Sequence, residues 1–407
     1  MEMTKEELGR RIRSARESCG LTQEQLGESV GLSRVALGQI ESGARSVSSL
    51  ELDRLARALG RDIKSFFATA FAERDALSAL FRLDAELAQQ VDLRKALQDS
   101  MALGRELTNL ERLLEIDRVR LITPAYKLRS AKSRWDAIGQ GQKVATEERR
   151  RLKLGLAPIG ALSELLESQG VRTSTVALPE NISGLTLIDS TIGLFVAINA
   201  NHAPVRQRFS LAHEYGHVLM DRDRALAISR VENHSDLLEV RANAFAAEFL
   251  MSAEGVAQFI LELGKGVTSR AQMAVFDEAE VVQVEQRATP GSQAIQLHDV
   301  VLLAHHFRVS RISVLYRLMN LRLIDEREFQ RLKAEEDRGD GRKIARFLAA
   351  PEVPTEDRSH LRRRFLALAR EAYRREEITR RKFAELASMV GLGPQEMEEF
   401  IASANWE

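Results

Sequence analysis

Cysteine is almost absent from this sequence, because Cys19 is the single one among 407 residues. One thiol excludes internal disulfides and cysteine-rich zinc or iron–sulfur sites. The chain also lacks an excess of charge of either sign: 59 basic residues balance 59 acidic ones, so overall charge favours neither nucleic acid nor a membrane surface. No apolar run approaches the roughly 18 residues that span a bilayer, and residues 1–11 lack the apolar core of a signal peptide. We therefore expect a cytoplasmic protein with no membrane partner.

Strand-like stretches are few and leucine-rich helical patterns are many, which predicts a mainly α chain with a small β-sheet. A chain of 407 residues is too long for one ordinary domain, and its 44% hydrophobic content can support real cores. We expect about two to four domains.

The stretch at residues 208–221 reads RFSLAHEYGHVLMD, in which His213 and Glu214 are followed after two residues by His217. This HExxH pattern is typical of zinc hydrolases. On a helix, residues four apart share one face, so the two histidines can present their imidazoles to one ion. Glu214 lies about 100° round the helix, where it can reach a metal-bound water. The stretch therefore predicts a Zn²⁺ site at which Glu214 is catalytic.

Two histidines do not complete a zinc site, so a third ligand is expected downstream. Residues 239–251 form an alanine-rich run without glycine or proline, which predicts a second helix. Glu239 and Glu248 compete for the third position, and either would complete the two-histidine, one-glutamate set of thermolysin-type enzymes. Asn243 follows Glu239 by one turn, well placed to accept a hydrogen bond from a ligating imidazole. This geometry favours Glu239.

Together, RFSLAHEYGH and the later ExxANxFAAEFLM resemble the ImmA/IrrE family of bacterial metallopeptidases, whose pattern runs roughly RFTLAHELGH and ExxANxFAAELLMP. The resemblance implies a zinc metalloendopeptidase with the ligands His213, His217 and Glu239 and the general base Glu214. It also implies a protein substrate, typically a DNA-bound repressor that is cleaved under stress, phage induction or DNA damage. The departures from the pattern touch none of the metal chemistry and fall at Ser210, Tyr215 and Ser252.

Upstream of this helix, residues 170–199 carry β-branched residues in alternation, which predicts three short strands. The last strand, at residues 193–199, leads directly into the metal-binding helix. An extended peptide substrate could add itself to the edge of this strand, or the strand could lie in an ordinary core. His202 and His234 flank the site and could polarise a substrate carbonyl, although surface-loop positions are the simpler interpretation. We assign residues 141–294 to an α+β, zincin-like peptidase domain.

A second recognisable unit begins the chain. Thr22 is placed to cap a short helix at residues 23–29, Gly31 turns the chain, and Ser33 is placed to cap the next helix. Two short helices joined by a tight, glycine-containing turn form a helix-turn-helix. The run TQEQLGESVGLSRVALGQIESG resembles the Cro/CI-type (XRE) repressor domain. We expect a five-helix DNA-binding domain at residues 1–69. Its apolar face is predicted to contain Leu26, Val30, Leu32, Val35 and Ile40.

Residues 33–41 are the predicted recognition helix of this unit. Arg34 and Gln39 are suited to base edges, whereas Gln23, Ser33 and Arg45 are suited to phosphates. The alternative is a protein-docking domain, because acids nearly cancel bases here and the electrostatic footprint is weak. We expect binding to double-stranded operator DNA, as a homodimer that reads two half-sites.

Residues 70–140 are leucine-rich and charged, which predicts a helical linker, folded as a hairpin, that contributes to dimerisation. The apolar register breaks at Ser100 and Gly104, which argues against one continuous heptad repeat. Pro124, Gly139 and Gly141 predict a break before the next domain. The apolar positions are Leu80, Leu83, Leu87, Val91, Leu107, Leu110 and Leu114.

The last part, residues 295–407, is predicted to be helical. Residues 297–318 have the pattern of helix, turn and helix, and could read DNA or pack against the peptidase domain. Residues 335–343 are polar and contain glycine, which predicts a mobile link. Pro351 and Pro354 predict a further break, after which the sequence is amphipathic and basic.

These units together predict a DNA-binding transcriptional regulator whose zinc-dependent peptidase domain cleaves a protein, most simply a repressor. The alternative is a non-proteolytic repressor or antitoxin, whose zinc domain senses a ligand or only stabilises the fold. The complete catalytic set, which includes the non-ligand Glu214, favours the protease.

Overall fold

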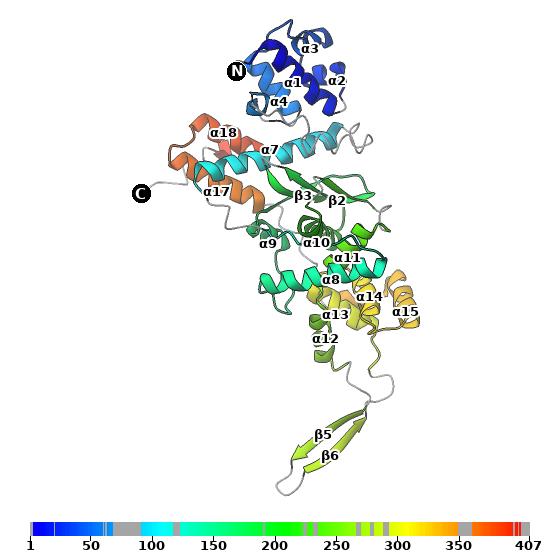
Figure 1. The fold of residues 1–407 in the computed structure, drawn as a ribbon. Helices are drawn as coiled ribbons and strands as arrows, with labels where there is room; N and C mark the ends of the chain where they lie inside the picture. The colour runs from blue at the N-terminus through cyan, green and yellow to red at the C-terminus, as the bar shows by residue number, and fades with distance from the viewer. Residues whose placement is uncertain are drawn as a thin grey trace.

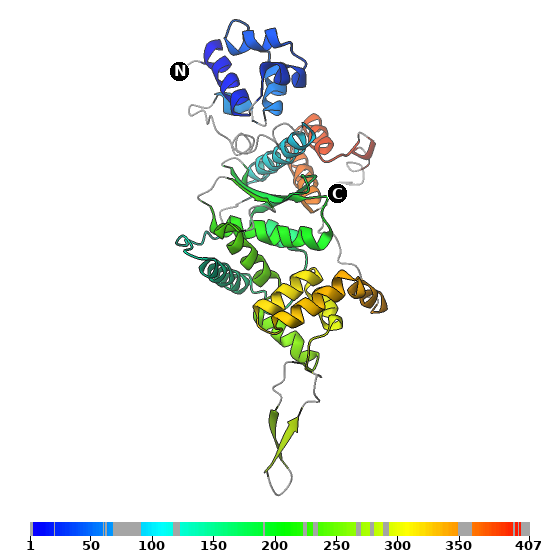
Figure 2. The same ribbon diagram turned by 90° about the vertical axis from the view of Figure 1, so that its right-hand side faces the viewer.

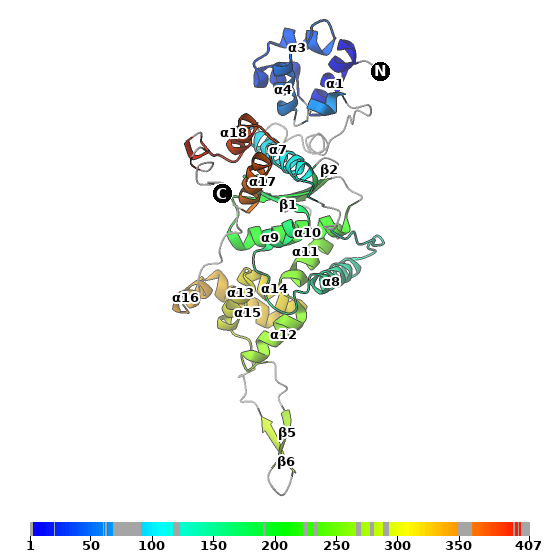
Figure 3. The same ribbon diagram turned by 90° about the vertical axis from the view of Figure 1, so that its left-hand side faces the viewer.

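The fold is described from a computed structural model of the chain. In three views, the N-terminal helical domain, a long linker helix, a small sheet and further helical layers follow one another (Figures 1, 2 and 3). The mainly α chain with a small β-sheet is as predicted. The residues described are 3–19, 21–59, 61, 63–67, 91–116, 123–189, 192–222, 226–230, 235–265, 270–276, 281–287, 293–348, 360–393, 395–397 and 399.

The N-terminal domain has the predicted five helical elements, of which the fifth is a short 3₁₀ helix. Thr22 caps the second helix in a capping box with Gln25, and Gly31 ends it in the left-handed conformation at φ 71°. Ser33 caps the third helix by accepting a hydrogen bond from the Ala36 amide. The elements are α1 (Lys5–Ser18), α2 (Gln23–Val30), α3 (Arg34–Glu41), α4 (Ser49–Ala58) and η1 (Ile63–Phe67).

Val35 is an exception to the predicted apolar face, because 69% of it is exposed. Leu37 and Ile40 are buried instead and face the core of the domain. Val35 precedes Leu37 by two residues, so it points to the other side of α3. The prediction for Val35 was therefore wrong, and its side chain lies on the outer surface beside Arg34.

The linker contributes one continuous helix, α7 (Val91–Leu113). Ser100 and Gly104, where the apolar register breaks, both lie inside this helix, so the break in register does not end it. A Cβ at Gly104 would lie 2.9 Å from Cγ2 of Ile192, so this glycine permits close packing and does not end the helix. The other arm of the predicted hairpin, with Leu80, Leu83 and Leu87, lies outside the described residues.

Among the described residues, the central sheet has four strands in the order β1-β3-β2-β4, of which only β1 and β3 are parallel to each other. Phe195 and Ala197 share a core with Leu97 and Met101 of α7, whereas Val196 and Ile198 share the opposite core with the helices below the sheet. Three strands were predicted, and the fourth lies in a segment for which no strand was predicted. The strands are β1 (Val171–Val176), β2 (Ile182–Asp189), β3 (Gly193–Asn199) and β4 (Leu226–Arg230).

Strand β3 lies between β1 and β2, so both of its edges are already paired. Of the two interpretations that the sequence left open for this strand, the structure therefore favours an ordinary core strand over an edge that binds substrate. Among the described strands, the sheet edges are β1 and β4.

Five helices build the layer below the sheet, where α10 contacts β2 and β3 and α11 packs against both α10 and α8. The break predicted at Gly139 and Gly141 was wrong, since both lie inside α8. A Cβ at Gly141 would collide with the carbonyl oxygen of Arg241, so the glycine lets α8 and α11 approach closely. The helices are α8 (Arg134–Arg151), α9 (Leu162–Ser168), α10 (Pro204–Met220), α11 (Leu237–Leu250) and α12 (Ala253–Glu262).

The helices after residue 295 divide into two groups. Helices α13 (Leu297–Phe307) and α14 (Arg311–Asn320) form the predicted helix, turn and helix, and they share the core of α10 and α11. The mobile link predicted at residues 335–343 was wrong, because α15 (Glu326–Asp337) and α16 (Asp340–Phe347) occupy it almost entirely. Gly339 makes the tight turn between them at φ 85°.

The second group, α17 (His360–Arg374) and α18 (Arg380–Met389), returns to the linker helix α7 (Figure 3). Leu107, Leu110 and Leu114 share a core with Phe365 and Phe383. The predicted break at Pro351 and Pro354 lies outside the described residues.

A hairpin of β5 (Arg270–Phe276) and β6 (Val281–Arg287) projects away from the helical layers (Figures 1 and 2). The sequence pattern did not predict this hairpin. Among the described residues, no single helix is long and apolar enough to cross a membrane; only the bent pair α11 and α12 reaches that length and composition jointly.

Candidate metal centre and candidate nucleic-acid interface

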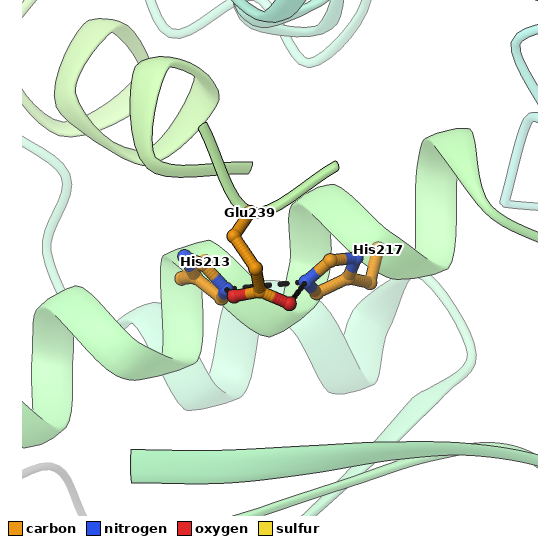
Figure 4. A group of neighbouring side chains, drawn as sticks. All are labelled: His213, His217 and Glu239. Carbon is orange, nitrogen blue, oxygen red and sulfur yellow. Dashed lines mark hydrogen bonds and ion pairs between the residues drawn. The ribbon is translucent and has the colours of Figure 1, made fainter. Parts of the chain in front are cut away.

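The structure brings His213, His217 and Glu239 together, with one donor atom of each within 4.8 Å of the others (Figure 4). The two histidines lie one turn apart on α10, and their Nε2 atoms are 3.1 Å from each other. Glu239 projects from the first turn of α11, with Oε2 3.1 Å from Nε2 of His213 and Oε1 3.5 Å from Nε2 of His217. All three side chains are buried.

The second nitrogen of each imidazole has its own partner. Nδ1 of His213 lies 2.9 Å from Oδ1 of Asn243, and Nδ1 of His217 lies 2.8 Å from Oδ2 of Asp221. These oxygens accept the Nδ1 protons, so each Nε2 can turn its lone pair toward the centre of the cluster. Asn243 takes the part predicted for it. Asp221 was missed, although its spacing of four residues from His217 places the two on one helix face.

The charges in this cluster are strongly coupled. Burial alone would lower the pKa of His217, but hydrogen bonds to Asp221 and Glu239 raise it to about 10. Burial opposes the ionisation of Glu239, yet hydrogen bonds from His213 and His217 lower its pKa to about 2. Two imidazole nitrogens and a carboxylate thus face one another in a buried space, an arrangement that suits a cation in place of the shared protons.

Glu214 lies beside these donors and is fully buried. Its Oε2 accepts a hydrogen bond of 2.6 Å from the Thr186 hydroxyl, whereas its Oε1 has no hydrogen-bond partner among the described residues. Gly184 lies directly against this carboxylate, because a Cβ there would be 2.8 Å from Oε1. Strand β2 therefore orients one oxygen of Glu214 and leaves room beside the other.

Glu248, the competing acid, does not face the histidines. Its carboxylate forms a buried ion pair with Arg317 of α14 and accepts a hydrogen bond of 3.1 Å from the Ala253 amide, at the start of α12. These contacts join α11 to α12 and α14.

The far side of α10 is anchored by a buried carboxylate, Glu148 of α8. The Tyr215 hydroxyl donates to one of its oxygens, and the Tyr126 hydroxyl donates to the other across 3.1 Å. Arg151 pairs with the same carboxylate. Tyr215 lies between the two histidines in sequence, so this network holds the helix segment that carries both.

His202 was predicted to be a surface residue, and that prediction was wrong. It is only 8% exposed, and its Nε2 lies 3.2 Å from the Glu180 carbonyl oxygen. Burial lowers its pKa, which favours the neutral ring. The loop folds inward because Asn199 and Gln207 also bind its backbone. His234 lies outside the described residues.

On α3, Arg34 and Gln39 are exposed, as direct contacts with bases require. Ser33 is also exposed, although its hydroxyl already caps the helix. Ser33 and Arg34 lie at the start of the predicted recognition helix, and Gln39 lies on its exposed side.

The two other residues predicted to contact phosphates are engaged within the domain. Gln23 donates a hydrogen bond of 2.8 Å to Glu41, the buried partner of Arg16. Arg45 forms an ion pair of 2.6 Å with Glu51 and is 38% exposed. Both side chains would have to share their N–H donors with a phosphate. Arg34 and Gln39 are therefore more available for contact with DNA.

Comparison with known proteins identifies the same two units. Residues 166–319 match the family described as the IrrE N-terminal-like domain, a peptidase family, and residues 12–66 match a helix-turn-helix family. The first match runs from the end of α9 to α14, and so includes the donor cluster, Glu214 and the α13–α14 pair.

One relative is described as a helix-turn-helix regulator. It is an uncharacterized HTH-type transcriptional regulator of Methanothermobacter thermautotrophicus, 47% identical over 51 residues. The aligned part covers 12% of this chain and 74% of that protein.

Proposed function

The chain belongs to the HTH-type transcriptional regulators and carries an IrrE-like peptidase-family domain, and on this premise we propose that it is a zinc-dependent endopeptidase that cleaves a repressor protein. The observation that carries the proposal is the carboxylate of Glu214. It lies buried beside three converging donors without being one of them, and Oε1 has no partner among the described residues. A site that only senses a ligand or stabilises the fold needs its three ligands and has no use for such an acid.

The donor set fits zinc. Two imidazole nitrogens and one carboxylate converge, and each imidazole is oriented by a hydrogen bond at its other nitrogen. His213, His217 and Glu239 would hold the ion. When bound, zinc acts as a Lewis acid that lowers the pKa of a water molecule and polarises a peptide carbonyl.

Glu214 moves the proton in this reaction. Its Oε1 atom accepts a proton from the water that attacks the scissile carbonyl, and later returns it to the leaving amine. Thr186 donates to Oε2 and so holds the carboxylate in one orientation. Gly184 keeps the space beside Oε1 open, because any larger residue would contact that atom.

The substrate chain pairs with strand β4 in this proposal. Thr186, which orients Glu214, pairs with Ala227 of β4. No described strand pairs with the outer edge of β4, so an extended peptide can add itself there by main-chain hydrogen bonds. A strand added at that edge would lie about 4.8 Å beyond β4.

The helix-turn-helix domain brings this activity to an operator. A homodimer would read two half-sites with the exposed face of α3, where Arg34 and Gln39 lie. Cleavage of a repressor at that operator would relieve repression under stress. If this chain is itself the repressor, the reaction is the same and the protein that is cut is the chain itself.

The test combines the purified full chain, with and without zinc, with the protein encoded by the neighbouring gene. We expect two fragments on a gel in the presence of zinc only, and no fragments with Glu214→Gln. If neither the neighbouring protein nor the chain itself is cut, while zinc still changes operator affinity, the chain is a zinc- or ligand-sensing repressor.

A further inference from the structure

A cavity of about 330 Å³ lies beside the donor cluster, between α8, α10, α11 and α14. Asn243 belongs to both, because its Oδ1 holds His213 while its side chain also lines the cavity. Phe209, Val240 and Met251 form part of its wall. None of these three has a part in the reaction proposed above.

The positions of the lining residues along α10 and α11 indicate how far the cavity lies from the donor cluster. Phe209 precedes His213 by four residues on the same face of α10, and Val240 follows Glu239 on α11. One helical turn is about 5.4 Å, and an extended peptide advances about 3.3 Å per residue. A peptide whose scissile bond lies at the donor cluster therefore brings a side chain to the cavity within about two residues of that bond.

The chemistry of the cavity suits an uncharged, apolar side chain. Ile138, Ala244 and Ala247 line it together with the three wall residues named above, beside the uncharged polar side chains of Gln142, Ser313 and Asn320. Arg317 also reaches it, but this guanidinium is buried and already bound by Glu248 and by the Met251 carbonyl oxygen. The volume lies at the lower end of the range for ligand pockets, about 300–1,000 Å³, and holds one large side chain.

The rim of the cavity has the composition of a protein-binding surface. Arg134 and Tyr316 line the cavity and are exposed, and Trp135, the residue next to Arg134, is 80% exposed. Tryptophan, tyrosine and arginine are the residues most enriched among the strong contributors to protein interfaces. An exposed tryptophan beside the cavity is available for contact with a bound chain.

We infer that this cavity is a specificity pocket that takes a large apolar side chain, such as leucine, methionine or phenylalanine, within about two residues of the cleaved bond. The inference rests on the proposed endopeptidase function and adds a class of substrate sequence to it. Trp135, Arg134 and Tyr316 contact the flanking residues of the same substrate segment.

Binding to the pocket is tested without catalysis. The probes are N-acetyl-leucine amide and N-acetyl-glutamate amide, added to full-length protein with carbon-13-labelled isoleucine and methionine methyl groups. We expect the leucine amide to shift the Ile138 and Met251 resonances in a saturable way, and the glutamate amide to leave them unchanged. Ala247→Phe fills the pocket and should abolish the shift. Leu261→Phe adds bulk at a position that is 56% exposed on α12, outside the pocket, and should leave the shift intact.

The second measurement identifies cleavage sites in a peptide library made by digesting a bacterial proteome. We expect large apolar residues at one position within about two residues of the cut, and a change to alanine, serine or glycine there with Ala247→Phe. Zinc content and melting temperature are measured for each variant, so that a misfolded protein is recognised. Absence of the methyl shift, or the same shift in Ala247→Phe, overturns the pocket. A saturable shift without any cleavage keeps the pocket and overturns the peptidase.

Discussion

Asp221 accepts a hydrogen bond from Nδ1 of His217 across 2.8 Å, at the point where α10 ends. The other oxygen of Asp221 binds Arg241, which lies on the helix that also supplies Glu239. One carboxylate therefore orients an imidazole of the donor cluster and joins the two helices that form it. Such outer partners hold a ligand in the orientation and tautomer that a metal requires.

Removing His217 tests the donor cluster. We expect the wild type to bind one zinc ion per chain and His217→Ala to bind none, because two donors cannot hold the ion in a buried site. Asp221→Asn should weaken zinc binding by about 10- to 100-fold without abolishing it. Elemental analysis after dialysis measures both. Equal zinc in His217→Ala and wild type contradicts the assignment.

Glu248 gives the matched control for that experiment and a prediction of its own. Its pair with Arg317 is buried, with 9% and 2% of the two side chains exposed. Glu248→Ala leaves a buried guanidinium without its counter-charge and should lower the free energy of unfolding by about 3–5 kcal/mol, while zinc content stays at one per chain.

The comparison for stability is Lys143→Ala, which breaks an exposed ion pair with Glu147 on α8. We expect a change below about 1 kcal/mol there, because water screens that pair. Urea unfolding followed by circular dichroism measures both variants. A loss of zinc in Glu248→Ala at full stability would mean that the wrong glutamate was chosen.

The donor cluster could be predicted from sequence because its geometry is local. His213 and His217 share a helix face by spacing alone, and Asn243 stands in the same relation to Glu239. The choice between Glu239 and Glu248 as the third donor depended on an indirect argument, the spacing of Asn243 from Glu239. The three strands before the metal helix and the capped helices of the N-terminal domain were also correct, since caps and alternation act within a few residues.

The wrong predictions share a different cause. Gly141 was interpreted as a break, yet it lies inside a helix where another segment comes close, as Gly104 does. That role depends on a neighbour distant in sequence, Ile192 in one case and Arg241 in the other. The position of β3 inside the sheet follows from its pairing with β1 on one side and β2 on the other, which the sequence of β3 alone could not predict. Local patterns give elements, whereas tertiary contacts decide their ends and neighbours.

The exposed face of α3 leads to a prediction for DNA. Arg34→Ala and Gln39→Ala should each weaken binding to the chain's own promoter by about 1–3 kcal/mol and relax the sequence preference. Arg57→Ala is the control, because this arginine, 63% exposed, pairs with Glu385 of α18 and so faces the body of the molecule. It should leave the preference unchanged. Gel shifts with promoter and random DNA measure this, and equal affinities for both would favour a protein-docking domain.

The last prediction separates a peptidase from a zinc-containing regulator, and it depends on Glu214. Glu214→Gln keeps the size of the side chain and can still accept the Thr186 hydrogen bond through its amide oxygen. It removes only the ability to take up a proton, a step that contributes about a hundred- to ten-thousandfold to such rates. We therefore expect a variant with wild-type zinc content, stability and operator affinity that neither cuts its substrate nor relieves repression in cells.

Thr186→Val makes the matching change on the other side of this hydrogen bond. The carboxylate remains and can still move a proton, but its orientation is no longer held, so cleavage should fall and not vanish. A sensor mechanism predicts no difference between Glu214→Gln and wild type, because zinc and its three ligands are intact in both. Derepression at the wild-type rate in the Glu214→Gln strain would thus exclude proteolysis as the means of regulation. Loss of derepression in that strain, with a graded loss in Thr186→Val, follows only if this carboxylate carries the proton.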